Sequence, residues 1–169
     1  MTRDPAPRPA ALEIPTAAVY LLPGQARVTA APTRFTTILG SCVAVCLFDP
    51  ASRLGGINHF LLPGAPPDPQ ADPLRWGESA TRWLVEAMLA QGAQRSTLEA
   101  KVFGGAHLAR AAGPVGDRVG PRNVATALAT LERLGIRVAA RGVGGAVGRK
   151  LVFESHTGSA YLRELIGDA

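Results

Sequence analysis

The stretch from Phe35 to Phe48 constrains the fold of this chain more than any other segment. Its residues are almost all apolar or β-branched, and from Cys42 onward both alternating faces are apolar. A strand with two apolar faces must be covered on both sides, which places it inside a layered protein. We expect one strand over Thr36–Phe48, a turn after it, and a partner strand over Gly55–Leu62.

The other segments add shorter strands and two helices. Apolar positions at helical spacing predict helices over Arg75–Gly92 and Val124–Leu134, with Asn123 as the N-cap of the second. Further strands are expected at Leu12–Leu22, Gln25–Ala30, Leu98–Phe103, Ile136–Ala140, Lys150–Glu154 and Ser159–Leu165. Strands outnumber helices without alternating strictly with them. This favours an α+β fold, with mixed β-sheets packed together and two or three flanking helices.

Length and composition indicate one domain. Of the 169 residues, 47% are hydrophobic, and this is long enough to bury a real core. We expect a Pro-rich tail over residues 1–12 and a single domain over residues 13–169. The formal charge is +5, but the basic residues are scattered and form no aromatic-basic cluster, so nucleic acid is not an expected partner.

The cysteines and the hydropathy indicate in which cellular compartment the protein is expected. Cys42 and Cys46 lie four positions apart in one expected strand, which is too far for a disulfide, and this indicates a reducing compartment. An apolar run of about 20 residues is needed to span a membrane, and this sequence has none. We therefore expect a cytoplasmic protein without membrane insertion.

One cysteine and one histidine stand out as a candidate catalytic pair. Cys42 follows the small residues Gly40 and Ser41, which leave room for a substrate, whereas Cys46 is flanked by bulky side chains. His59 lies on the expected partner strand and can hold the thiol as a thiolate–imidazolium pair. Such a pair needs a third group to orient the imidazole and backbone donors for an oxyanion. The candidate orienting groups are Thr36, Thr37 and Asn58, and the candidate donors are the N–H groups of Ser41 and Cys42.

The same residues also admit a purely structural interpretation. A buried strand cysteine is more often a small hydrophobic residue, and a single strand histidine is more often structural than catalytic. The two cysteines and three histidines lack the spacing of a zinc site. The glycine pairs at 104–105 and 144–145 match no phosphate-binding loop. No metal or cofactor is expected.

Four runs of sequence resemble one known family. They are Leu39–Pro50, Gly55–Pro63, Glu99–Ala106 and Gly120–Asn123. Together they resemble CheD, the chemoreceptor glutamine deamidases of bacterial and archaeal chemotaxis. The resemblance extends in order from about Val19 to Leu165, which is essentially the whole expected domain.

The resemblance implies a fold, a site and partners. The family fold is similar to the catalytic domains of deamidating toxins. Cys42 matches the family nucleophile, and His59 matches the family base. Thr36, six positions before Cys42, matches the threonine that completes the triad. Its neighbour Thr37 remains an alternative, since the match could be shifted by one residue. Family substrates are glutamines on the cytoplasmic helical bundles of chemoreceptors, which are hydrolysed to glutamate through a thioester. Some members also hydrolyse receptor methyl esters, and many bind the phosphatase CheC.

Two departures and two alternatives accompany this resemblance. Gly142–Gly145 lacks an aspartate that many members carry there, and His107 stands where an apolar residue is expected. Neither position belongs to the expected triad. The alternatives are a binding module for CheC or receptors, with catalysis secondary or lost, and a transglutaminase-like transfer through the same thioester.

Overall fold

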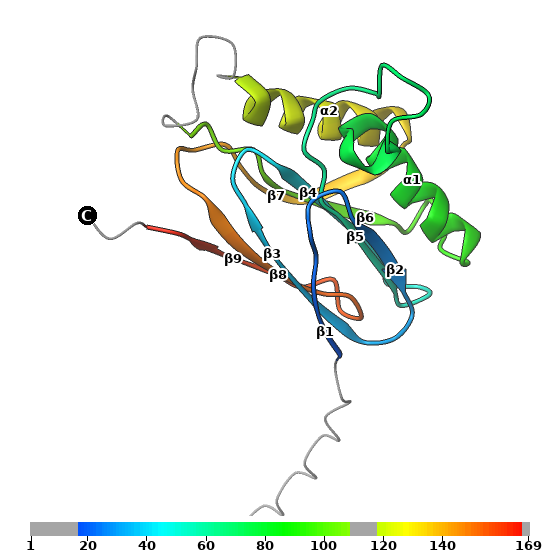
Figure 1. Cartoon of the computed structure of the whole chain (residues 1–169). Helices are drawn as coiled ribbons and strands as arrows, with labels where there is room; N and C mark the ends of the chain where they lie inside the picture. The colour runs from blue at the N-terminus through cyan, green and yellow to red at the C-terminus, as the bar shows by residue number, and fades with distance from the viewer. Residues whose placement is uncertain (1–16, 109–117, 167–169) are drawn as a thin grey trace, which may run out of the picture.

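The computed structural model describes residues 17–108 and 118–166, which form three layers (Figure 1). The first sheet has the strand order β1 (Ala17–Tyr20), β3 (Thr33–Leu39), β8 (Arg149–Glu154) and β9 (Ala160–Glu164). The second has the order β2 (Ala26–Thr29), β5 (Leu54–Asn58), β4 (Val43–Asp49), β6 (Glu99–Gly104) and β7 (Arg137–Val143). The helices are α1 (Gly77–Ala90) and α2 (Val119–Arg133), with the short 3-10 turn η1 (Pro73–Arg75).

The expected fold class is confirmed. Each sheet is mixed, since β1 pairs with β3 and β6 with β7 in parallel while the other ladders are antiparallel. Two helices flank the second sheet. The expected tail over residues 1–12, and residues 13–16 of the first expected strand, lie outside the described residues. No helix formed by residues 17–108 or 118–166 is long and apolar enough to cross a membrane.

Strand β4 lies at the centre of the molecule, as its sequence predicts. All seven of its residues are buried. Val43, Val45 and Leu47 pack with the two helices in one core cluster, whereas Ala44 and Cys46 pack between the two sheets in another. Helices cover one face of the strand and the other sheet covers its second face. Both faces are therefore buried, which explains why the sequence of β4 is apolar without interruption.

The expected single strand over Thr36–Phe48 is wrong. The chain forms β3, leaves the first sheet at Gly40–Cys42, and continues as β4 in the second sheet. The two halves have different hydrogen-bonding partners, because β3 pairs with β8 whereas β4 pairs with β5 and β6. Apolar periodicity continues across the break, so the pattern alone could not separate the halves. The small residues at 40 and 41 mark the change of sheet.

The expected start of the second helix is also wrong. Helix α2 begins at Val119, and Asn123 lies inside it, fully buried. Pro121 fixes the backbone of the first turn, and this is the better signal for the start of the helix. The side chain of Asn123 therefore does not cap α2 and is available for contacts with other segments.

Candidate active site

The turn at Gly40–Cys42 is held by donors from two distant segments. Its first carbonyl accepts a hydrogen bond from the Ala106 N–H at 2.9 Å, and its last accepts one from the Gly105 N–H at 2.8 Å. The middle carbonyl, that of Ser41, accepts from Asn123 Nδ2 at 2.9 Å. All three carbonyls of the turn are therefore engaged, which fixes the backbone on either side of the cysteine.

The glycine pair after β6 allows this close approach. Gly104 has φ +101, and a Cβ at this position would lie 2.3 Å from the Cys42 carbonyl oxygen. Only glycine fits such a backbone at such a distance. Behind the pair, the buried Arg149 guanidinium donates to the carbonyl of Gly104 at 3.0 Å and to that of Gly142 at 2.9 Å. It also donates to the Gly144 carbonyl, so one side chain fixes three carbonyls at the ends of β6 and β7.

His59 directly follows β5 and lies on the same sheet face as Cys42. Val43 and Phe60 exchange backbone hydrogen bonds of 3.2 and 3.0 Å, which continues the β4–β5 ladder past the end of the strand. In this register His59 lies opposite Ala44, two positions along from Cys42. Diagonal neighbours on such a ladder lie about 7–8 Å apart and are within reach of long side chains. Both residues face the layer between the sheets, where Cys42 packs on the inter-sheet cluster.

The histidine tautomer follows from its hydrogen bonds. Thr37 Oγ1 lies 2.9 Å from His59 Nδ1 and 2.8 Å from the Leu21 carbonyl oxygen. A hydroxyl has one proton, and the carbonyl can only accept, so that proton goes to Leu21. His59 Nδ1–H must then donate to Thr37, which leaves the lone pair on Nε2. Among the described residues Nε2 has no hydrogen-bond partner, so its lone pair is available to accept a proton.

The expected contact from Thr36 to the histidine is not found; Thr37 makes it. Side chains alternate along β3, so adjacent threonines lie on opposite faces. Thr37 is buried between the sheets, whereas Thr36 lines an open depression on the outer face beside Val152 and Tyr161. The third candidate, Asn58, accepts from the Val45 N–H at 2.9 Å through Oδ1.

Burial sets the charge state of the pair. Burial raises the pKa of the Cys42 thiol, and its own backbone N–H lowers it by a smaller amount. Burial lowers the pKa of His59 to about 4. Both shifts favour the neutral forms at neutral pH, which differs from the thiolate–imidazolium pair expected from the sequence. The imidazole is therefore a free base that can take the thiol proton as substrate binds.

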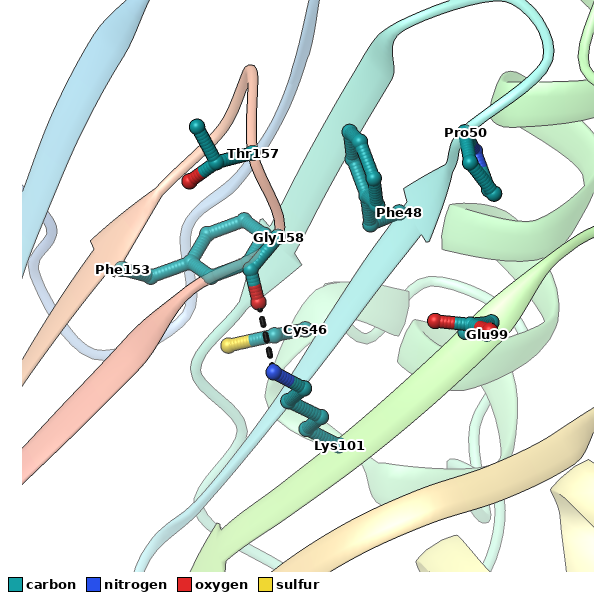
Figure 2. A pocket seen from close by; sticks show the side chains of 8 residues that line it. All are labelled: Cys46, Phe48, Pro50, Glu99, Lys101, Phe153, Thr157 and Gly158. Atoms are coloured by element: carbon teal, nitrogen blue, oxygen red, sulfur yellow. Dashed lines mark hydrogen bonds between the residues drawn. The ribbon is translucent and has the colours of Figure 1, made fainter.

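Cys46 lies in a different environment, shown in Figure 2. It borders a cavity of about 210 Å³ lined by side chains that include Phe48, Phe153 and Lys101. Burial raises the pKa of Cys46 far above neutrality, although Lys101 opposes this shift. The Lys101 ammonium donates to the Gly158 carbonyl at 2.7 Å and is no base for a thiol. Glu99 also lines the cavity, but its carboxylate is paired with Arg137 at 2.5 Å, and no histidine is among the described residues that line the cavity.

Nothing in the described part of the chain forms a metal centre. Within residues 17–108 and 118–166, no three side chains of His, Cys, Asp or Glu gather where they could hold a metal ion. The polar groups around Cys42 are instead backbone amides, a hydroxyl, a carboxamide and one imidazole. A thiol and a neutral imidazole on one sheet face, with a hydroxyl that orients the imidazole, are groups used in nucleophilic catalysis.

Comparison with known proteins identifies the family. The family described as "CheD chemotactic sensory transduction" matches residues 61–164. A relative from Anaeromyxobacter dehalogenans, named "Probable chemoreceptor glutamine deamidase CheD 1", is 49% identical over 93% of this chain and 92% of its own. Two further relatives carry the same name without the numeral. The one from Trichlorobacter lovleyi is 44% identical over 85% of this chain and 88% of its own. The one from Rhizobium meliloti is 42% identical over 88% of this chain and 81% of its own. This chain belongs to the CheD family.

Sequence reasoning missed the residues that hold the cysteine turn. The sequence predicts Asn123 as a helix cap, and it shows only that the glycine pair at 104–105 matches no phosphate-binding loop. Both lie in runs that carry the family resemblance, and the structure brings these runs together around Gly40–Cys42. The available signal was that Asn123 and the glycine pair lie within the runs that resemble the family. That they contact the same turn can be seen only in the tertiary structure.

The two threonines give a matched test of which one orients the imidazole. Thr37→Val keeps the side-chain shape but removes the acceptor for Nδ1–H, and one lost buried partner costs about 1–3 kcal/mol. We expect kcat for amide hydrolysis to fall by roughly 5–150-fold on that basis. Thr36→Val should remain within about twofold of the unmodified protein, because it lies on the other face. Steady-state ammonia release measures both, and a larger loss in Thr36→Val would reverse the assignment.

Proposed function

We propose that this protein hydrolyses glutamine side chains of chemoreceptors to glutamate, with Cys42 as nucleophile and His59 as general base. The names of the relatives, probable chemoreceptor glutamine deamidases, support the substrate and the reaction. The observation that carries the proposal is the free Nε2 of His59, on the sheet face that Cys42 shares. Thr37 takes the orienting role expected of Thr36.

The first half-reaction forms a thioester. His59 Nε2 accepts the Cys42 thiol proton, and the sulfur attacks the carbonyl carbon of the glutamine side chain. The C=O electron pair moves onto oxygen, and the N–H groups of Ser41 and Cys42 stabilise the oxyanion. The imidazolium then protonates the nitrogen, the C–N bond breaks, and ammonia leaves.

The second half-reaction restores the enzyme. His59 removes a proton from water as its oxygen attacks the thioester carbon. The tetrahedral intermediate collapses, the C–S bond breaks, and the Cys42 sulfur regains its proton from the imidazolium. The product is a glutamate carboxylate, so each turnover adds one negative charge to the receptor helix. No metal or cofactor takes part in these steps.

The proposal extends to the setting of the enzyme. Chemoreceptor helical bundles reach into the cytoplasm, and we place this protein there as a single domain over residues 13–169 with a tail before it. The family resemblance implies the phosphatase CheC as a partner, and this chain is proposed to bind it. Binding of CheC would then control how much enzyme is free to act.

The direct test is mass spectrometry of a purified receptor cytoplasmic fragment incubated with the protein. Hydrolysis adds roughly one dalton at each modified glutamine and releases one ammonia. A receptor with unchanged mass after long incubation would contradict the proposal. Added amine separates hydrolysis from transglutaminase-like transfer, since transfer would attach the amine to the receptor. A methylated receptor supplied in parallel reports any ester hydrolysis.

The runner-up is a binding module for CheC or receptors with catalysis secondary or lost. The raised pKa of the Cys42 thiol is the observation in its favour, because a binding module does not need a reactive thiol. Ammonia release from a receptor fragment that the protein binds distinguishes the two. Release supports the enzyme, whereas binding without release supports the module.

A further inference from the structure

Asn123 joins the two parts of the proposed site. It is fully buried, and its Nδ2 donates to the Ser41 carbonyl at 2.9 Å and to the Leu61 carbonyl at 2.9 Å. Ser41 directly precedes the cysteine, and Leu61 lies two residues after the histidine. One carboxamide on α2 therefore ties the segment that carries the thiol to the segment that carries the base.

The bond to Ser41 has a specific consequence for the next N–H. The Ser41 carbonyl and the Cys42 N–H belong to the same peptide group, which is planar and trans. Their C=O and N–H bonds therefore point in opposite directions. When Asn123 holds the Ser41 oxygen on the α2 side, the Cys42 N–H must point away from α2. The same N–H lowers the pKa of the Cys42 thiol.

The same geometry applies one residue earlier. The Ala106 N–H holds the Gly40 carbonyl, and this fixes the direction of the Ser41 N–H in the same way. Within the described residues, neither the Ser41 nor the Cys42 N–H donates a backbone hydrogen bond to another residue. Each N–H is thus oriented by the hydrogen bond that the carbonyl of its own peptide group accepts. Both N–H groups are left available for an incoming oxygen.

We propose that Asn123 is a positioning residue, which aims the Cys42 N–H at the carbonyl oxygen of the substrate by holding the Ser41 carbonyl. This inference rests on the proposed function and adds a group that acts through the backbone. Asn123 does not touch the reacting atoms in this role. Its contribution appears only when negative charge develops on the substrate oxygen.

Two reactions of the same thiol separate this role from a general structural one. Amide hydrolysis develops an oxyanion, whereas alkylation by iodoacetamide replaces iodide at carbon and develops none. In Asn123→Ala we expect kcat for ammonia release to fall by about 10–100-fold with KM little changed, below the loss from deleting a direct oxyanion donor. The alkylation rate of Cys42 should stay within about threefold, because it depends on the thiol and its base.

Thr130→Ala is the matched control for stability. Thr130 is also buried on α2, but its hydroxyl donates to the Thr126 carbonyl of its own helix at 2.7 Å. We expect a lower Tm with unchanged kcat. If Asn123→Ala loses hydrolysis and alkylation in parallel, or loses neither, the proposed role is wrong.

A second variant covers the case in which Asn123→Ala does not fold. Asn123→Asp has the same shape but, when ionised, has no donor for the two carbonyls. Its carboxyl can donate one hydrogen bond once it is protonated, and burial beside carbonyl oxygens raises the pKa of such a group. We expect the ratio of its kcat to that of the unmodified protein to rise as pH falls from 8 to about 6.

The outcomes of the two proposals can be distinguished. A constant kcat ratio for Asn123→Asp across that pH range contradicts the positioning role. An unmodified protein that alkylates readily but releases no ammonia contradicts the proposed function. An active unmodified protein together with a fully active Asn123→Ala contradicts the positioning role alone.

Discussion

Replacing Cys42 by alanine is expected to abolish ammonia release from a receptor fragment while the fold persists. The thiol is the proposed nucleophile, so its removal leaves His59 with nothing to deprotonate except water. Loss of a nucleophile lowers kcat by at least about 10³-fold. The side chain is only partly buried, so its truncation should leave the circular dichroism spectrum unchanged. Undiminished ammonia release by Cys42→Ala would remove the basis of the mechanism.

Cys46→Ala is the matched control on the same strand. Cys46 is buried between the sheets, and no histidine is among the described residues that line its cavity. Its truncation should cost about 1 kcal/mol of unfolding free energy through lost packing, with kcat unchanged. Urea unfolding and steady-state kinetics on the two variants separate packing from chemistry. If Cys46→Ala were the inactive variant, the roles of the two cysteines would be reversed.

Replacing His59 by glutamine is expected to remove activity and to change how stability depends on pH. Without the imidazole, no group is positioned to take the thiol proton or to protonate the leaving nitrogen, and we expect kcat to fall by about 10³-fold. The side chain is 2% exposed, and Gln can keep a polar contact with Thr37. A variant that retained activity would show that another group acts as the base.

The pH dependence of stability follows from the shifted pKa of His59. In the folded protein burial lowers this pKa from 6.5 to about 4, so between these values the unfolded chain binds more protons. Stability from this group is therefore complete above pH 6.5 and is lost as pH falls toward 4. Each pKa unit corresponds to about 1.4 kcal/mol, which gives a loss of about 3 kcal/mol.

Comparison of two proteins isolates that loss. Between pH 7 and 4, the unfolding free energy of the unmodified protein should fall by about 3 kcal/mol more than that of His59→Gln. Urea unfolding at a series of pH values measures the difference. Parallel curves for the two proteins would mean that His59 ionises normally in the folded state, and the neutral resting pair would be wrong.

The break between β3 and β4 shows most clearly how much of the fold can be predicted from the sequence. Local patterning predicts one continuous strand that is buried on both faces from Cys42 onward, because alternating faces can be read from residue order alone. It could not show that β3 and β4 belong to different sheets, since an apolar run has the same periodicity on either side of such a break. The pairing of β3 with β8 and of β4 with β6 assigns the two strands to different sheets. These pairs join residues that are more than 50 positions apart in the sequence.

The adjacent threonines show the same limit at the scale of one residue. The family spacing pointed to Thr36, although the neighbouring Thr37 was an open alternative. Which of the two faces the histidine depends on the register of β3 against the second sheet, and a shift of one residue exchanges the two faces. The structure places Thr37 on the inner face, 2.9 Å from the imidazole.

The sequence by itself determined which reactive groups are present and which strand is central. The reactive groups are a thiol after two small residues and one histidine expected on a neighbouring strand, and the central strand is apolar on both faces. These are local properties of residue type and order. Only the tertiary structure decided what surrounds the thiol, because the three donors that hold its turn come from the segment directly after β6 and from α2. Their convergence is a property of packing, which no local pattern in the chain encodes.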